Sequence, residues 1–210
     1  MKYDSVIFDL DGTLWDSVDG VIETWKIILK KHPEIKRDEI TRKDLEVGMG
    51  LLAADIGKGL FPKETSEVQL QLMKECSGEE CRYLAKHGGK IYDNLEDTLK
   101  VLKDKGVKLF IVSNCQDGYI EAFLKAHKME SYFIDSECPG RTGKNKSENI
   151  KLIVERNNLK KPVYVGDTIT DANSAKEAGV PFIFASYGFG DVKDYEYSID
   201  NFKELLNVLI

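Results

Sequence analysis

From Gly88 onwards the sequence alternates between short apolar runs and amphipathic stretches, and this alternation constrains the fold more than any other feature. Runs such as 107–112 have the length and composition of buried strands, and the stretches between them repeat their apolar residues at helical spacing. Regular alternation of this kind predicts an α/β fold with a doubly wound, Rossmann-like parallel sheet. The expected strands are 107–112, 132–134, 163–165 and 181–185, and the expected helices are 95–105, 119–127, 147–157 (with Ser147 as N-cap) and 172–178.

The N-terminal part divides into a strand and a long helical segment. Residues 5–10 resemble the later buried strands, whereas 17–84 shows helical periodicity without a β-branched run. We therefore expect an all-helical domain, residues 16–84, inserted into a core made of residues 1–15 and 85–210. Hinges are expected near 15–17 and 84–89.

Composition excludes several classes of function. The chain has 210 residues and a formal net charge of −6, which argues against nucleic acid or an acidic membrane surface as a partner. No apolar stretch approaches membrane-spanning length and the N-terminus lacks a signal peptide, so we expect a cytoplasmic protein that does not bind membranes. The four cysteines lack zinc-ligand spacing and are expected to be reduced thiols.

The first apolar run is followed directly by Asp9-Leu10-Asp11-Gly12-Thr13. Continued strand alternation would send Asp9 and Asp11 to the same side, at the sheet edge where open α/β folds place their active sites. Two carboxylates there can share a divalent cation, and one of them can act as a nucleophile. A solvated Asp-Gly turn explains these five residues equally well.

Later strands also end in polar residues. Ser113 and Asn114 follow strand 107–112 and can donate hydrogen bonds to phosphate oxygens, although an ordinary turn has the same composition. Asp167 follows strand 163–165, and Asp171 lies four residues later, as cation ligands or as residues of a helix N-terminus. The intervening basic loop 140–146 contains lysines that can neutralise a carboxylate and a phosphoryl group.

In this order and spacing, the motifs resemble those of the haloacid dehalogenase-like (HAD) superfamily over the whole chain. The motifs are the DxDGT sequence at 9–13, the strand-terminal Ser113, a lysine within 144–146, and GDxxxD at 166–171. The helical segment is placed like the C1-type cap of phosphoglycolate phosphatase-like and β-phosphoglucomutase-like members.

The resemblance implies roles for individual residues. Asp9 would attack phosphorus and form an aspartyl-phosphate, and Asp11 would act as general acid and base. Mg²⁺ would be held by Asp9, the main-chain carbonyl of Asp11 and Asp167, with Asp171 nearby. Ser113 and Asn114 would hold the phosphoryl oxygens. The catalytic, phosphate-binding lysine is taken as Lys146, with Lys144 as the alternative.

The expected function is Mg²⁺-dependent hydrolysis of a small phosphorylated metabolite by a monomer or weak homodimer. Dehalogenases of this fold lack the second aspartate, so Asp11 argues against dehalogenation. A phosphomutase like β-phosphoglucomutase is the main alternative, but such enzymes carry a histidine where this chain has Val21. A non-enzymatic regulator that binds a phosphorylated metabolite should have lost one of Asp9, Asp11 and Asp167.

Overall fold

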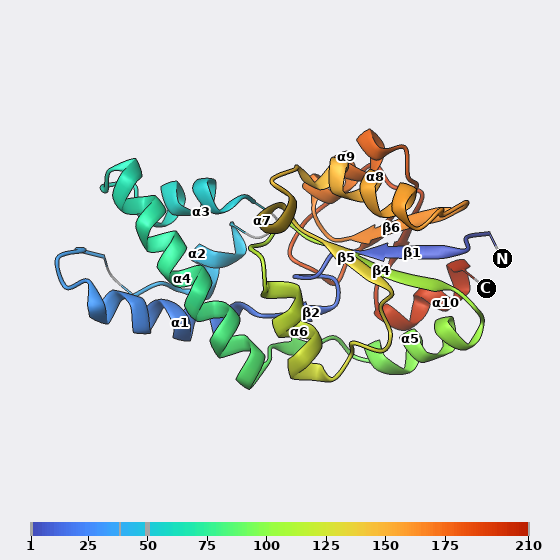
Figure 1. Cartoon of the computed structure of the whole chain (residues 1–210), viewed down its shortest axis with the longest axis horizontal. Coiled ribbons are helices and arrows are strands. Elements are labelled where there is room, and N and C mark those ends of the chain that lie inside the picture. The colour runs from blue at the N-terminus through green and yellow to red at the C-terminus, as the bar shows by residue number, and fades with distance from the viewer. Residues whose placement is uncertain (1, 38, 49–50, 210) are drawn as a thin grey trace.

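A six-stranded parallel sheet forms the centre of the computed structural model, which describes residues 2–37, 39–48 and 51–209 (Figure 1). The strand order is β5-β4-β1-β6-β7-β8, and every neighbouring pair is parallel. This confirms the predicted fold class. The strands are β1 (Ser5–Phe8), β4 (Lys108–Val112), β5 (Asp135–Glu137), β6 (Pro162–Gly166), β7 (Phe182–Ala185) and β8 (Tyr197–Ile199).

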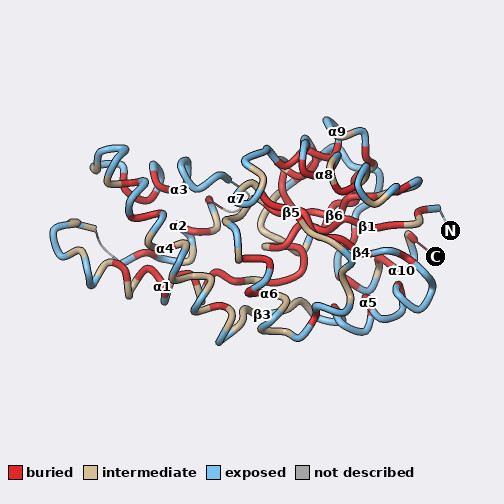
Figure 2. The backbone as a smooth tube through the Cα atoms, viewed as in Figure 1, coloured by how far each residue is buried: buried red, intermediate tan, exposed pale blue. Residues whose placement is uncertain are grey.

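Both faces of the sheet are apolar and are covered by helices. Successive residues of each strand point to opposite sides, so every strand contributes to both faces. Phe8 and Ile111 belong to one apolar cluster, whereas Ile7 and Phe110 belong to a second one. Helices α8 (Lys146–Arg156) and α9 (Ile169–Ala178) cover the face of the second cluster. The opposite face is covered by α5 (Leu95–Asp104), α6 (Tyr119–His127), the short 3₁₀ helix η1 (Phe202–Glu204) and α10 (Leu205–Leu209) (Figure 1). The central strands β1, β4 and β6 are therefore buried except at the first residues of β4 and β6, while the helices keep exposed outer faces (Figure 2).

A group of helices lies at the end of the molecule opposite the chain termini (Figure 1). It comprises α1 (Val18–Lys31), α2 (Arg42–Glu46), α3 (Ala53–Leu60) and α4 (Ser66–His87), and α4 also packs against α6 of the sheet domain. None of the helices in the described ranges is both long and apolar enough to cross a membrane.

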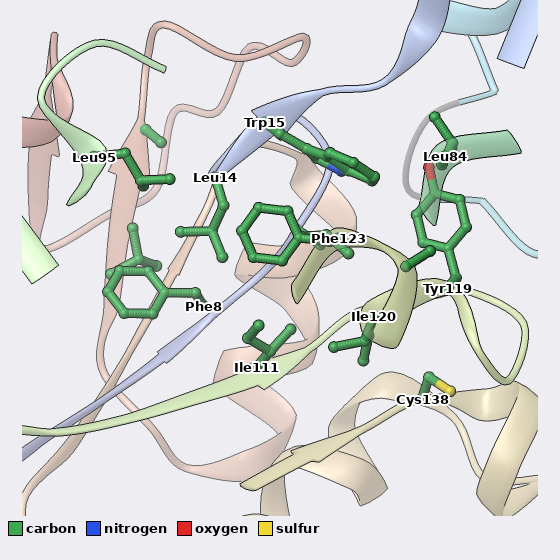
Figure 3. Close-up of a cluster of buried hydrophobic side chains, with 14 of the residues drawn as sticks. Phe8, Leu14, Trp15, Leu84, Leu95, Ile111, Tyr119, Ile120, Phe123 and Cys138 are labelled. Atoms are coloured by element: carbon green, nitrogen blue, oxygen red, sulfur yellow. The ribbon is translucent and has the colours of Figure 1, made fainter. Parts of the chain in front are cut away.

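The chain passes between the sheet and these helices through a short antiparallel pair that the sequence did not predict. Strand β2 (Trp15–Asp16) pairs with β3 (Lys90–Ile91). Strand β2 lies within the first expected hinge, and β3 directly follows the second. The Trp15 side chain is buried against Tyr119 and Phe123 of α6, with ring centroids 5.7 and 5.1 Å away (Figure 3). The division into a core and an inserted helical domain remains a prediction.

Two local predictions were wrong. The strand expected at 132–134 lies at Asp135–Glu137, where the backbone pairs with β4 at the sheet edge. Phe133 precedes this strand and packs edge-on against Phe8, whereas Ile134 is exposed. The N-cap of α8 is Asn145 and not Ser147. Asn145 forms a capping box with Glu148, which satisfies two backbone N–H groups at once.

Candidate active site

The predicted polar residues gather at the carboxyl edge of the sheet. Phe8 lies in register with Ile111 of β4 and Val165 of β6, so the residues that follow these strands emerge side by side. The backbone N–H of Asp9 donates to the carbonyl of Val165 at 2.8 Å, which ties Asp9 to β6. Ser113 and Asp167 lie one residue past the ends of β4 and β6, and both are buried.

Lys146 is the cation at the centre of this site. Its Nζ donates to Oδ1 of Asp9 at 2.9 Å and to Oδ1 of Asp171 at 2.6 Å, with all three side chains buried. Burial alone would lower the pKa of Lys146, but the negative charges of Asp171 and Asp9 raise it by more. The net shift of the pKa is upward, so the ammonium stays charged. Burial and the nearby Asp171 raise the pKa of Asp9 to about 7, against the opposing effect of Lys146.

The carboxylates of Asp9, Asp167 and Asp171 form a compact acidic cluster, with one oxygen of each lying within 4.8 Å of the others. One ammonium against three carboxylates leaves negative charge uncompensated, and hard oxygen ligands of this kind suit Mg²⁺. Gly12 allows the close packing. Its φ is +81°, and a Cβ at this position would lie 2.1 Å from Oδ2 of Asp167.

Asp171 is largely engaged by protein donors. Its Oδ1 accepts from Lys146 and, at 3.3 Å, from the Tyr164 hydroxyl. Its Oδ2 accepts from the backbone N–H of Thr168 at 2.9 Å and from the Thr168 hydroxyl at 2.6 Å. Thr168 and Asp171 form the capping box of α9, so the helix start fixes the carboxylate that holds Lys146.

The carboxylate of Asp11 has different partners from that of Asp9. Its Oδ1 accepts from the Ser17 hydroxyl at 2.6 Å and from the Tyr119 hydroxyl at 3.1 Å. Because β1 ends at Phe8, strand alternation does not extend to Asp11, and its side chain stays outside the acidic cluster. Burial raises the pKa of Asp11 to about 6, despite the hydrogen bonds from Ser17 and Tyr119, a range suited to general acid and base catalysis.

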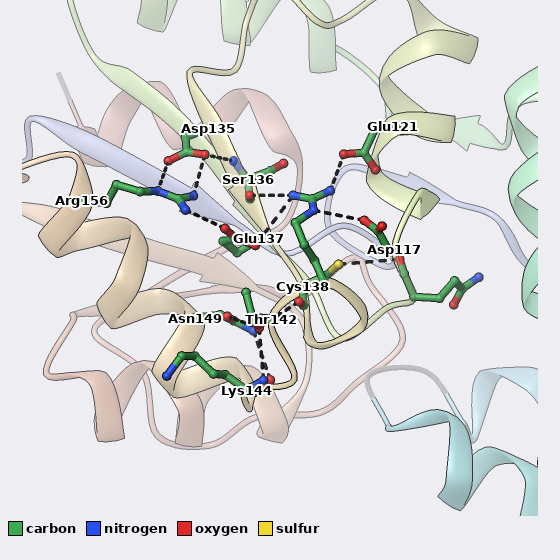
Figure 4. A network of polar contacts seen from close by, with 12 residues as sticks. Asp117, Glu121, Asp135, Ser136, Glu137, Cys138, Thr142, Lys144, Asn149 and Arg156 are labelled. Atoms are coloured by element: carbon green, nitrogen blue, oxygen red, sulfur yellow. Dashed lines mark hydrogen bonds and ion pairs between the residues drawn. The ribbon is translucent and has the colours of Figure 1, made fainter.

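The loop before α8 turns Lys146 inwards and Lys144 outwards. Arg141 binds Asp117 and Glu121, which anchors the short helix α7 (Pro139–Thr142) near α6 (Figure 4). The hydroxyl of Thr142 then donates to Oδ1 of Asn149 at 2.7 Å, and the Asn149 amide donates to the carbonyl of Lys144. Lys144 is exposed to solvent.

A cavity of about 420 Å³ opens beside the site between the sheet domain and the helices α1–α4. Asp11 and Asn114 line it from the sheet side. Val21, the position at which the mutases carry a histidine, lines it from α1 and offers only an apolar surface. The structure thus brings Asp9, Lys146, Asp167 and Asp171 into one cluster. Ser113 lies past the end of the neighbouring strand β4, and Asn114 and Asp11 line the cavity.

Several polar residues at the site were not predicted. The pattern Thr-x-x-Asp at 168–171 is a readable capping box and could have identified Thr168. Tyr119 had no such signal, because its hydroxyl contacts Asp11 and Ser17, which are far away in the chain. The same holds for the hydroxyl of Thr13, 3.4 Å from Oδ1 of Asp167. Ser17 is six residues from Asp11, but it follows β2, which the sequence did not predict.

The chain is similar to known proteins over nearly its whole length. It is 25% identical to a phosphoglycolate phosphatase of Vibrio parahaemolyticus, covering 97% of this chain and 95% of that one. It is 22% identical to an N-acetylmuramic acid 6-phosphate phosphatase of Pseudomonas aeruginosa, covering 100% and 96%. A haloacid dehalogenase-like family hydrolase from Streptococcus pneumoniae superposes with a TM-score of 0.85 at 18% identity, covering 100% and 99%.

The same relationship appears at the level of the family. Residues 6–185, which include every strand-end acid of the site, match the family model described as haloacid dehalogenase-like hydrolase. The matched fold and the site at the carboxyl edge of its sheet lead to one conclusion: this chain is a hydrolase of the haloacid dehalogenase-like family.

Proposed function

We propose that this protein is a Mg²⁺-dependent phosphatase that hydrolyses a small phosphomonoester through an aspartyl-phosphate on Asp9. One observation carries the proposal: the Asp9 carboxylate is held by Lys146 at a sheet edge beside a cavity, while Asp11 lies next to it with separate partners. The names of the relatives support the same reaction class, because both denote phosphatases.

In the proposed first step, an oxygen of Asp9 attacks phosphorus and the bond between phosphorus and the leaving oxygen breaks. Lys146 holds the attacking carboxylate in place and offsets charge on the phosphoryl group. Asp11, protonated at the start, gives its proton to the leaving oxygen. Ser113 and Asn114 are proposed to bind the phosphoryl oxygens, as residues at the end of β4.

In the second step, water attacks phosphorus, the bond between phosphorus and the Asp9 oxygen breaks, and Asp11 takes up the proton that the water loses. Inorganic phosphate leaves, and the Asp9 carboxylate is regenerated. The hydroxyls of Ser17 and Tyr119 hold Asp11 in one orientation through both steps. The cation would be held by the carboxylates of Asp9 and Asp167 and the main-chain carbonyl of Asp11, where it supplies positive charge against the phosphate. Asp171 instead positions Lys146, since its own oxygens accept from protein donors.

The helices α1–α4 are proposed to act as a cap that covers the cavity and excludes water during the reaction. The pair β2–β3 is the natural place for a hinge, because both connections between the helices and the sheet domain pass through it.

Hydrolysis of p-nitrophenyl phosphate tests the reaction class directly. The purified protein should release p-nitrophenol in Mg²⁺, lose this activity in excess chelator, and regain it when Mg²⁺ is restored. Activity that persists undiminished after exhaustive chelation would contradict the proposed cation. A screen of phosphorylated metabolites then identifies substrates, and glucose 1-phosphate should give free phosphate instead of an isomerised sugar phosphate.

Replacement of Asp11 should separate the two steps. Because p-nitrophenolate leaves without a proton, Asp11→Asn should still phosphorylate Asp9 but should hydrolyse the intermediate slowly, lowering kcat by about 10²–10⁴-fold. We expect a burst of p-nitrophenol and a phosphorylated protein by intact-mass spectrometry. Steady turnover at the wild-type rate, without trapped phosphoenzyme, would show that Asp11 is not the proton shuttle.

A further inference from the structure

The cavity beside Asp11 has an unusual wall for a site that would take an anionic metabolite. Apolar side chains from the four helices α1–α4 line its outer part: Val21, Trp25, Leu45, Ile56 and Met73. Among the described lining residues there is no lysine, arginine or histidine, and Asp11 and Glu80 are the acidic ones. A leaving group bound here therefore meets apolar surface and negative charge.

Glu80 is the acid that the proposed mechanism does not use. It lies on α4 and faces the cavity where α4 approaches the sheet domain. Its Oε2 accepts from Nε2 of Gln116 at 2.8 Å, and its Oε1 accepts from the Cys76 thiol at 3.3 Å. Both donors are neutral, and no cation within the described ranges forms an ion pair with Glu80. Burial raises the pKa of this carboxyl.

A half-buried carboxylate with neutral partners has distinct consequences for different ligands. An ammonium group placed beside it would gain a charge-assisted hydrogen bond and would compensate the negative charge. A second anionic group would be desolvated against an apolar wall and repelled by Glu80, with no cation among the described residues of the cavity wall to offset the cost.

We propose that Glu80 selects the leaving group, so that the enzyme hydrolyses phosphomonoesters of amino alcohols with an apolar body and rejects esters that carry a carboxylate. This inference rests on the proposed phosphatase function and narrows its substrate class. It separates this chain from the two relatives above, whose names both denote enzymes acting on phosphorylated carboxylic acids.

A matched series of alkyl phosphates tests the selection. The esters share a chain length and end in an ammonium, a methyl or a carboxylate group, and the series is repeated at several lengths. At the best length, kcat/KM should fall in the order ammonium, methyl, carboxylate, with about 100-fold between the first and the last. A carboxylate ester that is hydrolysed as well as the ammonium ester would overturn the proposal.

The variant Glu80→Gln tests whether Glu80 causes the preference for the ammonium ester. It keeps the shape of the side chain but removes the charge, so kcat/KM for the ammonium ester should drop about tenfold, to the level of the methyl ester. The neighbouring Glu79→Gln is the matched control, because Glu79 pairs with Arg82 at 2.6 Å and does not line the cavity. It should keep the wild-type order.

Hydrolysis of p-nitrophenyl phosphate serves as the reference in every variant. Glu80→Gln should still hydrolyse this ester, which shows that the variant is folded and active, and the ratio of kcat/KM for the ammonium and methyl esters is then compared within each variant. If the wild type hydrolyses this ester but Glu80→Gln leaves the ammonium preference intact, the role of Glu80 is refuted and the phosphatase function stands. If the wild type hydrolyses no phosphomonoester at all, both proposals fall together.

Discussion

Asp9→Asn should abolish phosphatase activity, lowering kcat on p-nitrophenyl phosphate by a factor on the order of 10⁴ or more, because a carboxamide cannot form the aspartyl-phosphate. The substitution is nearly isosteric, and Asp171 remains as a partner for Lys146, so the fold should be retained. The activity is followed as initial rates in Mg²⁺, and intact-mass spectrometry should find no phosphoenzyme.

The other end of the same strand offers a matched control. Asp4 immediately precedes β1, where its Oδ1 accepts from the Ser5 hydroxyl and from the backbone N–H of Lys161, at the sheet edge away from the site. Asp4→Asn should retain activity within about twofold, since its effect is confined to local hydrogen bonds. Asp9→Ala is measured alongside, because deamidation of the introduced asparagine would restore the native aspartate. Wild-type turnover by both Asp9 variants would refute the mechanism.

The sheet could be predicted because its strands are apolar runs that are buried on both faces. Such runs are visible without knowledge of their partners, as with Val163 to Val165. The edge strand β5 could not be found in this way, because Asp135–Glu137 is polar and becomes a strand only by pairing with β4. Strands β2 and β3 could not be predicted for the same reason. Each is only two residues long and forms a strand only because it pairs with the other.

The candidate site likewise contains residues that could be predicted from the sequence and residues that could not. Residues that directly follow a strand, such as Asp9 and Asp167, were predictable because the parallel sheet brings their positions together. Tyr119 and Glu80 lie on helices with ordinary helical periodicity, and only the packing of α4 against α6 brings them to the cavity. The sequence motifs thus predict the residues at the strand ends, whereas the helical residues that line the cavity depend on tertiary packing.

The second large effect on kcat is expected from substitution of Lys146, the residue preferred over Lys144 as the catalytic lysine. Lys146→Met should lower kcat by about 10²–10³-fold, because it removes the positive charge that holds the attacking carboxylate and faces the transferring phosphoryl group. Lys144→Met is the matched control two residues away, on a side chain that is exposed to solvent. It should leave kcat unchanged. The reverse result would move the catalytic role to Lys144.

The same pair of variants should differ in stability, which separates a structural loss from a chemical one. Lys146→Met leaves Asp9 and Asp171 buried beside Asp167 without their ammonium partner, and breaking a buried pair in this way costs roughly 3–5 kcal/mol of unfolding free energy. Urea unfolding in chelator should show this loss for Lys146→Met but not for Lys144→Met. Mg²⁺ should restore part of it, because the acids that lose Lys146 still form a ligand set for a cation. Equal unfolding curves for the two variants in chelator would mean that the buried acids do not depend on Lys146, and the proposed positioning of Asp9 would lose its basis.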